Sequence, residues 1–87
     1  MAELWGGTNT TVKRVSGVPG MLFIRATTVQ SGDTLTIPCK EIITSVLHDE
    51  TTLGGARGVK GTGSNINRLT VTCTNDDNIN FHVAIQR

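Results

Sequence analysis

One six-residue segment occurs twice in nearly the same form, and it limits the possible folds more than any other feature. Residues 34–39 read TLTIPC and residues 68–73 read RLTVTC. Apolar and polar side chains alternate in both copies, and successive residues of a β-strand point to opposite faces of the sheet. Each copy therefore predicts a strand with one buried row and one threonine-rich row on the outside.

The rest of the chain also divides into short strand-like segments. Strands are predicted over residues 10–15, 21–30, 34–38, 41–48, 69–74 and 79–86, with a further short strand through Val59. Residues 41–48 fit a helix as well as a strand buried on both sides, and their β-branched side chains favour the strand. We expect an all-β fold, a small antiparallel β-sandwich or barrel of six to seven short strands.

Turn residues between these segments predict two hairpins. Ser31, Gly32 and Asp33 would join residues 21–30 to 34–38. A loop of residues 76–78, with Asn78 in the left-handed region, would join the last two strands. In that register Val71 lies opposite Val83, because core residues are expected to face core residues.

The length of 87 residues allows one domain. Residues 1–9 have no sustained periodicity and are predicted to form an N-terminal arm, and residues 10–87 a single β domain. Residues 51–67 contain five glycines and are predicted to form a long glycine-rich loop.

Charge and hydropathy exclude several classes of function. A net charge of +1 gives little attraction to nucleic acid or to an anionic membrane. Residues 1–14 lack the apolar segment of a secretory signal, and no stretch reaches membrane-spanning length. We therefore expect no membrane partner and folding in a cytoplasm, and a nucleic-acid partner is disfavoured.

Two cysteines and two histidines are the candidates for a zinc site. Cys39 and His48 are nine residues apart, as are Cys73 and His82. Alternation places His82 on the face opposite to Phe81 and away from Cys73, so a four-ligand zinc site is disfavoured. Buried reduced thiols are favoured over a disulfide. We expect no metal and no cofactor.

Other chemical motifs have simpler explanations. Residues 75–78 (NDDN) offer oxygen ligands for calcium but are also the residue types of a turn. Residues 54–63 are glycine-rich but lack the Gly-Lys-Ser/Thr ending of a phosphate-binding loop. No serine or cysteine has a catalytic setting, so the chain is predicted not to be an enzyme.

The threonine rows raise one alternative function. Exposed Thr-x-Thr rows are formed by Thr34 and Thr36 and by Thr70, Thr72 and Thr74, and they are similar to the surfaces of some β-rich ice-binding proteins. Strand propensity on a solvated face explains the same residues. A small ice- or surface-binding module is therefore one possible function of the chain, and a small nucleic-acid-binding module is another.

The order of strands and turns resembles the small β-sandwich structural proteins of tailed phages and prophages. The resemblance lies in residues 31–38, residues 42–46, the glycine-rich loop, residues 69–71 and residues 79–85. It implies a non-enzymatic capsid decoration or minor virion protein, located in the virion and assembled in the host cytoplasm. It also implies a homo-oligomer, foremost a trimer, that binds a major capsid protein or another virion protein.

Three residues are candidates for partner binding. Trp5 is the first, because tryptophan is enriched at binding hot spots, although it fits equally well as a cover over the domain's own open end. Arg57 and Lys60, in the glycine-rich loop, are the others. When many copies of the chain bind one shell, weak contacts of this kind add up to tight attachment.

Overall fold

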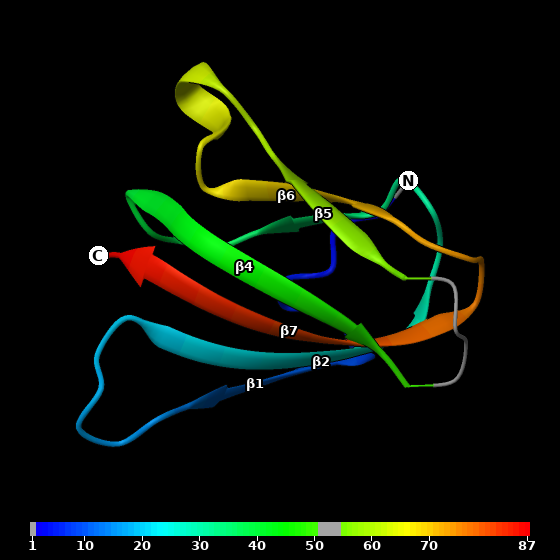
Figure 1. Cartoon of the computed structure of the whole chain (residues 1–87), viewed down its shortest axis with the longest axis horizontal. Helices are drawn as coiled ribbons and strands as arrows, with labels where there is room; N and C mark the ends of the chain where they lie inside the picture. The colour runs from blue at the N-terminus through cyan, green and yellow to red at the C-terminus, as the bar shows by residue number, and fades with distance from the viewer. Residues whose placement is uncertain (1, 51–54) are drawn as a thin grey trace.

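Two antiparallel sheets form the domain in the computed structural model, which describes residues 2–50 and 55–87. The four-stranded sheet has the order β1-β2-β7-β4 and the three-stranded sheet the order β3-β6-β5. Figure 1 shows the sheets as two layers. The strands are β1 (Thr10–Arg14), β2 (Met21–Val29), β3 (Thr34–Thr36), β4 (Glu41–Asp49), β5 (Arg57–Lys60), β6 (Arg68–Thr72) and β7 (Asp77–Gln86). The all-β prediction is confirmed.

The core lies between the two sheets and consists of the inward rows that alternation predicts. Phe81 is fully buried at its centre, and Ile37, Val71 and Val83 are at most 1% exposed. Burying a side chain of this kind contributes about 1.5–3 kcal/mol relative to leaving it in water. The interior depends on aliphatic side chains packed around a single phenylalanine.

The two copies of the repeated segment are neighbours in the three-stranded sheet. β3 and β6 pair antiparallel, with Leu35 opposite Leu69 and Thr34 opposite Thr70. Both leucines are buried. The similar sequences therefore form two similar strands, side by side, with one shared buried row.

The predicted hairpins are wrong. β2 pairs with β1 and β7, while β3 pairs with β6, so residues 31–33 connect the two sheets instead of joining paired strands. β6 and β7 also lie in different sheets. Val71 and Val83 are both buried, but they belong to opposite layers. Alternation shows which row faces the core and does not show whether another core row is beside it or across from it.

The turn before β7 differs in the same way from its predicted form. Asp76, and not Asn78, has the positive φ, at 62°. Asn75 accepts a hydrogen bond from the Ser31 amide at 3.0 Å, and Asn78 accepts one from the Thr28 amide at 3.2 Å. These side chains tie the turn to the end of β2, which supports the interpretation of residues 75–78 as a turn.

The described part of the glycine-rich segment contains β5, as predicted for Val59, and a short 3-10 helix, η1 (Gly63–Asn65). Residues 51–54 of that segment lie outside the described residues. β5 runs beside β4 without joining its sheet. A Cβ added to Gly58 would lie 3.2 Å from a methyl carbon of Leu47, so the glycine permits this close approach.

Candidate partner-binding surface

The N-terminal segment lies along the edge of the three-stranded sheet. Glu3 forms a parallel bridge to Thr34, with the Leu4 amide donating to the Thr34 carbonyl at 2.8 Å and the Thr34 amide donating to the Ala2 carbonyl at 2.9 Å. Leu4 is part of the core at 8% exposure. This part of the expected arm is docked on the domain, and its apolar residue contributes to folding.

The Glu3 carboxylate holds this docked segment in place. It accepts hydrogen bonds from the Thr36 amide and hydroxyl, each at 2.7 Å, and from the Thr34 hydroxyl at 3.1 Å. Burial raises the pKa of Glu3, but the hydrogen bonds from Thr36, Trp5 and Thr34 together outweigh burial and lower the pKa below its usual value. The ionised carboxylate is therefore favoured in the folded protein.

Buried Asp33 anchors the same segment from the other side. Its carboxylate accepts the Ala2 amide and the Gln30 amide, each at 2.9 Å, and the residue is 3% exposed. A buried carboxylate is tolerated where hydrogen bonds replace its hydration. Asp33 thus links the chain start to the turn after β2 and has a structural explanation.

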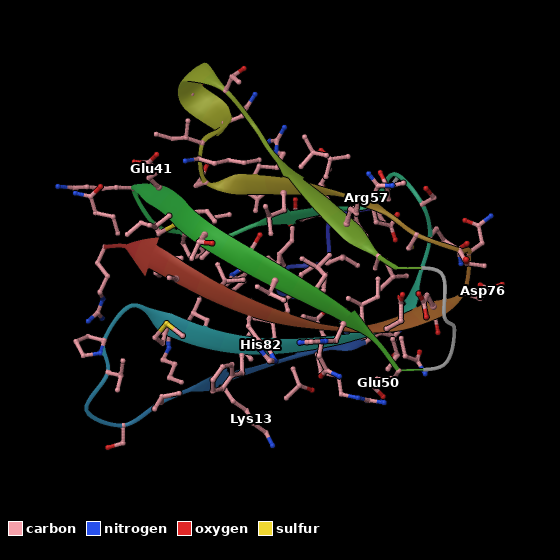
Figure 2. The ribbon with its side chains drawn as sticks, in the orientation of Figure 1. Lys13, Glu41, Glu50, Arg57, Asp76 and His82 are labelled. Carbon is pink, nitrogen blue, oxygen red and sulfur yellow. The ribbon has the colours of Figure 1, made fainter. Side chains whose placement is uncertain are left out.

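The three predicted partner-binding residues lie in different settings. Trp5 is half-buried and packs against the core, which is the covering position considered from the sequence. Arg57 is exposed at the start of β5, and Lys60 forms an ion pair with Glu41 of β4. Figure 2 labels Arg57 on β5 and Glu41 on β4. The structure brings Arg57 and Lys60 onto one strand and leaves Trp5 elsewhere, beside the docked segment.

Exposed apolar side chains on β4 and β5 were missed from the sequence. Ile43 is 62% exposed, Val46 52% and Val59 61%. Residues 41–48 were expected to form a strand buried on both sides, and that expectation is wrong: Ile42 is buried while Ile43 and Val46 face outward. A bulge between Ile42 and Thr44 explains why two adjacent isoleucines differ in burial. We call Ile43, Val46, Arg57 and Val59 the β4–β5 surface.

The outer face of the four-stranded sheet holds both histidines. His82 of β7 lies opposite Val46 of β4 and opposite Phe23 of β2. His48 lies diagonally across from His82, with ring centroids 4.9 Å apart. Phe23 packs edge-on against His82 at 5.1 Å. The two histidines are thirty-four positions apart in the sequence, and the pairing of β4 with β7 makes them neighbours in space.

Both thiols lie apart from this face. Cys39 and Cys73 are free and half-buried against the core. Burial raises the pKa of each thiol, and for Cys73 the carboxylates of Asp77, Asp49 and Asp33 raise the pKa further. Among the described residues there is no group of three or more His, Cys, Asp or Glu side chains placed to hold a metal ion.

Acidic side chains at the end of β4 are used within the fold. Asp49 accepts the Ala56 amide at 2.9 Å. The hydrogen bond from the Asp77 side chain is the largest cause that lowers the pKa of Asp49. Glu50, two strands away from Arg25, forms an ion pair with it at 2.8 Å and accepts Asn80 at 2.7 Å. These contacts connect β4 to β2, β5 and β7.

The surface hollows found in the described residues are small. Two surface hollows, at the β1–β2 turn and beside the docked N-terminal segment, measure about 180 Å³ each, whereas ligand pockets are typically about 300–1,000 Å³. Within residues 2–50 and 55–87, no helix has the length and apolarity needed to cross a membrane.

Comparison with known proteins gave no relatives: no family model, no curated protein and no solved structure matches this chain.

Proposed function

We propose that this protein is a non-enzymatic structural protein of a virion, a capsid decoration or minor virion protein that self-associates and attaches to a shell. The observation that carries the proposal is the β4–β5 surface. Three of the five large apolar side chains that are exposed in the described residues lie on these two neighbouring strands. A small β domain with such a surface is suited to assembly with copies of itself.

The composition of the β4–β5 surface supports self-association. Scattered exposed apolar residues are ordinary on a protein surface, but Ile43 and Val59 keep about three-fifths of their area in water on β4 and β5, edge strands of the two sheets that contact each other. Arg57 lies two residues from Val59, and arginine is enriched in interfaces. A short domain also buries a smaller share of its surface by itself, so covering these side chains in an oligomer adds stability.

The polar residues support a structural role over a catalytic one. Glu3, Asp33 and Asp49 accept backbone amides, and Glu50 is paired with Arg25. Carboxylates engaged in this way connect strands of the fold, which is a structural role. The two hollows described above, of about 180 Å³ each, lie at the β1–β2 turn and beside the docked N-terminal segment.

Trp5 remains a proposed contact to the shell, and a point substitution tests it more cleanly than a deletion of the N-terminal segment. Deleting residues 1–7 would remove Leu4 from the core, so loss of binding would not separate folding from attachment. Trp5→Ala, with Leu4 in place, removes only the half-buried ring. Attachment that is weakened while the melting temperature changes by a few degrees would identify Trp5 as a contact.

One observation favours ice or surface binding as a second candidate. The pairing of Thr34 with Thr70 places threonines from the two repeats side by side. The hydroxyls of Thr34 and Thr36, however, are bound to Glu3, and Arg68 occupies the position opposite Thr36. Thermal hysteresis of the purified protein, lost in Thr70→Lys, would favour this candidate over the virion role.

The direct test of the virion role is the composition of particles. Particles released by the source culture after prophage induction are purified on a density gradient and analysed by quantitative mass spectrometry. The proposal expects peptides of this chain in the particle fraction, at a fixed ratio to the most abundant shell protein. Their presence only in the soluble fraction would contradict it.

A further inference from the structure

The two histidines on the outer face of the four-stranded sheet form a pair with defined geometry. His48 lies opposite Asn80, and His82 opposite Val46, so the histidines occupy diagonal positions on adjacent antiparallel strands. Their ring centroids are 4.9 Å apart with an interplanar angle of 58°. Both residues are exposed. Figure 2 labels His82 on this face, together with Lys13 and Glu50.

This separation fits two imidazoles bound to one metal ion. With a Zn–N distance of about 2.0–2.1 Å and roughly 1.2 Å from nitrogen to ring centre, two ligating rings at angles of roughly 90–110° have centroids roughly 4.5–5.4 Å apart. The observed 4.9 Å lies within this range. We infer that His48 and His82 form a two-imidazole binding site for a divalent transition-metal ion.

The surrounding fold holds the pair in position before a metal binds. Residues 44–49 of β4 pair continuously with β7, which fixes both backbones. Phe23 packs edge-on against the His82 ring at an interplanar angle of 66°, so rotation of that ring is restricted. A site that is already arranged loses less conformational freedom on binding than two independent surface side chains would.

Neighbouring charges on this face partly cancel. Glu50 is paired with Arg25, and Lys13 lies opposite Phe23 on β1. The Glu50 carboxylate also accepts Asn80, the residue opposite His48. Glu50 therefore places one negative charge near the pair and Arg25 and Lys13 place two positive charges there, so a metal ion would be held by the imidazole nitrogens and not by net charge.

The ligand type predicts which ions bind. Imidazole suits copper, nickel and zinc, whereas magnesium and calcium prefer oxygen ligands. The chain supplies two ligands, since no larger group of ligating side chains occurs in the described residues. Water completes the coordination, so exchangeable binding is expected, with Cu²⁺ bound more tightly than Ni²⁺ or Zn²⁺.

Calorimetric titration of the purified full chain with CuCl₂, NiCl₂ and ZnCl₂ tests this inference. We expect one ion per chain, with MgCl₂ giving no binding. His48→Gln and His82→Gln should each weaken Zn²⁺ binding at least tenfold. Thr44→Gln, on the same strand and also exposed, is the matched control and should bind as the unmodified protein does. Circular dichroism checks that all three variants fold.

Two further readouts keep the assignment falsifiable. Zn²⁺ should shift the imidazole proton resonances of His48 and His82 together in NMR spectra. It should also raise the melting temperature, because the two ligands are adjacent only in the folded sheet. Binding that persists in both histidine variants, or that is lost in Cys39→Ser or Cys73→Ser, would overturn the site, as would the absence of binding at 1 mM Zn²⁺. Val46 of the β4–β5 surface lies opposite His82. The titration nevertheless measures metal binding by the purified chain, and self-association is tested at Ile43 and Val59, so the two proposals can fail separately.

Discussion

Leu35 lies directly opposite Leu69 in the antiparallel pair of β3 and β6, and both side chains are buried to 1% exposure or less. The two copies of the repeated sequence segment therefore stabilise one another. A contact between residues this far apart in the chain forms only when the three-stranded sheet has assembled. It makes the leucine pair a sensitive probe of the whole sandwich.

Leu69→Ala is expected to lower the free energy of unfolding by about 2–5 kcal/mol, because it removes buried methyl groups and leaves a cavity. Chemical denaturation measures the change. Val18→Ala, at an exposed valine in the β1–β2 turn, is the control and should cost less than about 0.5 kcal/mol. A double variant with Leu35→Ala should show coupling of about 0.5–3 kcal/mol. Strict additivity would contradict direct contact between the leucines.

Local pattern was sufficient to predict the strands and their buried rows. Phe81, Val83 and Ile37 are buried as alternation requires, and β4 is a strand despite its equal fit to a helix. Pairing was not predictable in the same way. The sequence pattern of Val71 and Val83 fits a hairpin register, yet the two residues belong to different sheets. In a sandwich, a buried row can have another buried row beside it in its own sheet or across from it in the facing sheet.

Acid titration tests the role of Glu3. Its folded pKa lies below the usual value of 4.5, so its ionised form contributes stability that is fully present above that value and is lost as the pH falls through the folded pKa. Glu3→Gln should therefore be less stable than the unmodified protein at pH 7, with the difference shrinking below about pH 4.5. Urea unfolding at a series of pH values measures this difference. A constant difference across the range would contradict the proposed role of the charge.

Thr28 has a backbone conformation that is costly for its residue type. Its φ is 57°, in the left-handed region that β-branched side chains rarely adopt. Thr28→Asn should raise the free energy of unfolding by about 1 kcal/mol, because asparagine tolerates this region better. Thr11→Asn, in the regular part of β1, should lower stability slightly. Thermal unfolding of both variants measures the two changes in stability. If Thr28→Asn lowers the stability, the backbone of Thr28 is not strained as proposed.

Gly61 permits a tight turn before η1. A Cβ at this position would lie 2.3 Å from the carbonyl oxygen of Asn65, a distance that requires the backbone to move. Gly61→Ala should therefore cost about 1–3 kcal/mol. At Gly63 an added Cβ meets nothing within 4 Å, so Gly63→Ala should cost less, only the penalty of its positive φ. Denaturation midpoints that reverse this order would contradict the turn geometry.

The candidate site was less predictable than the fold. Arg57 was named from the sequence and lies on the β4–β5 surface, but Ile43 was interpreted as buried because a bulge cannot be read from alternation. His48 and His82 were considered as zinc ligands together with the cysteines. The structure separates them from the cysteines and brings the two histidines together, a result of the β4–β7 register that no local pattern contains.

The most direct test of the proposed self-association is the molar mass in solution, measured by size-exclusion chromatography with light scattering. The account predicts a defined oligomer of the 9.3 kDa chain, foremost a trimer. Ile43→Lys and Val59→Lys should dissociate it, whereas Val18→Lys, at an exposed valine in the β1–β2 turn, should not. A monomer for the unmodified protein, or an oligomer that survives both lysine substitutions, would contradict the account.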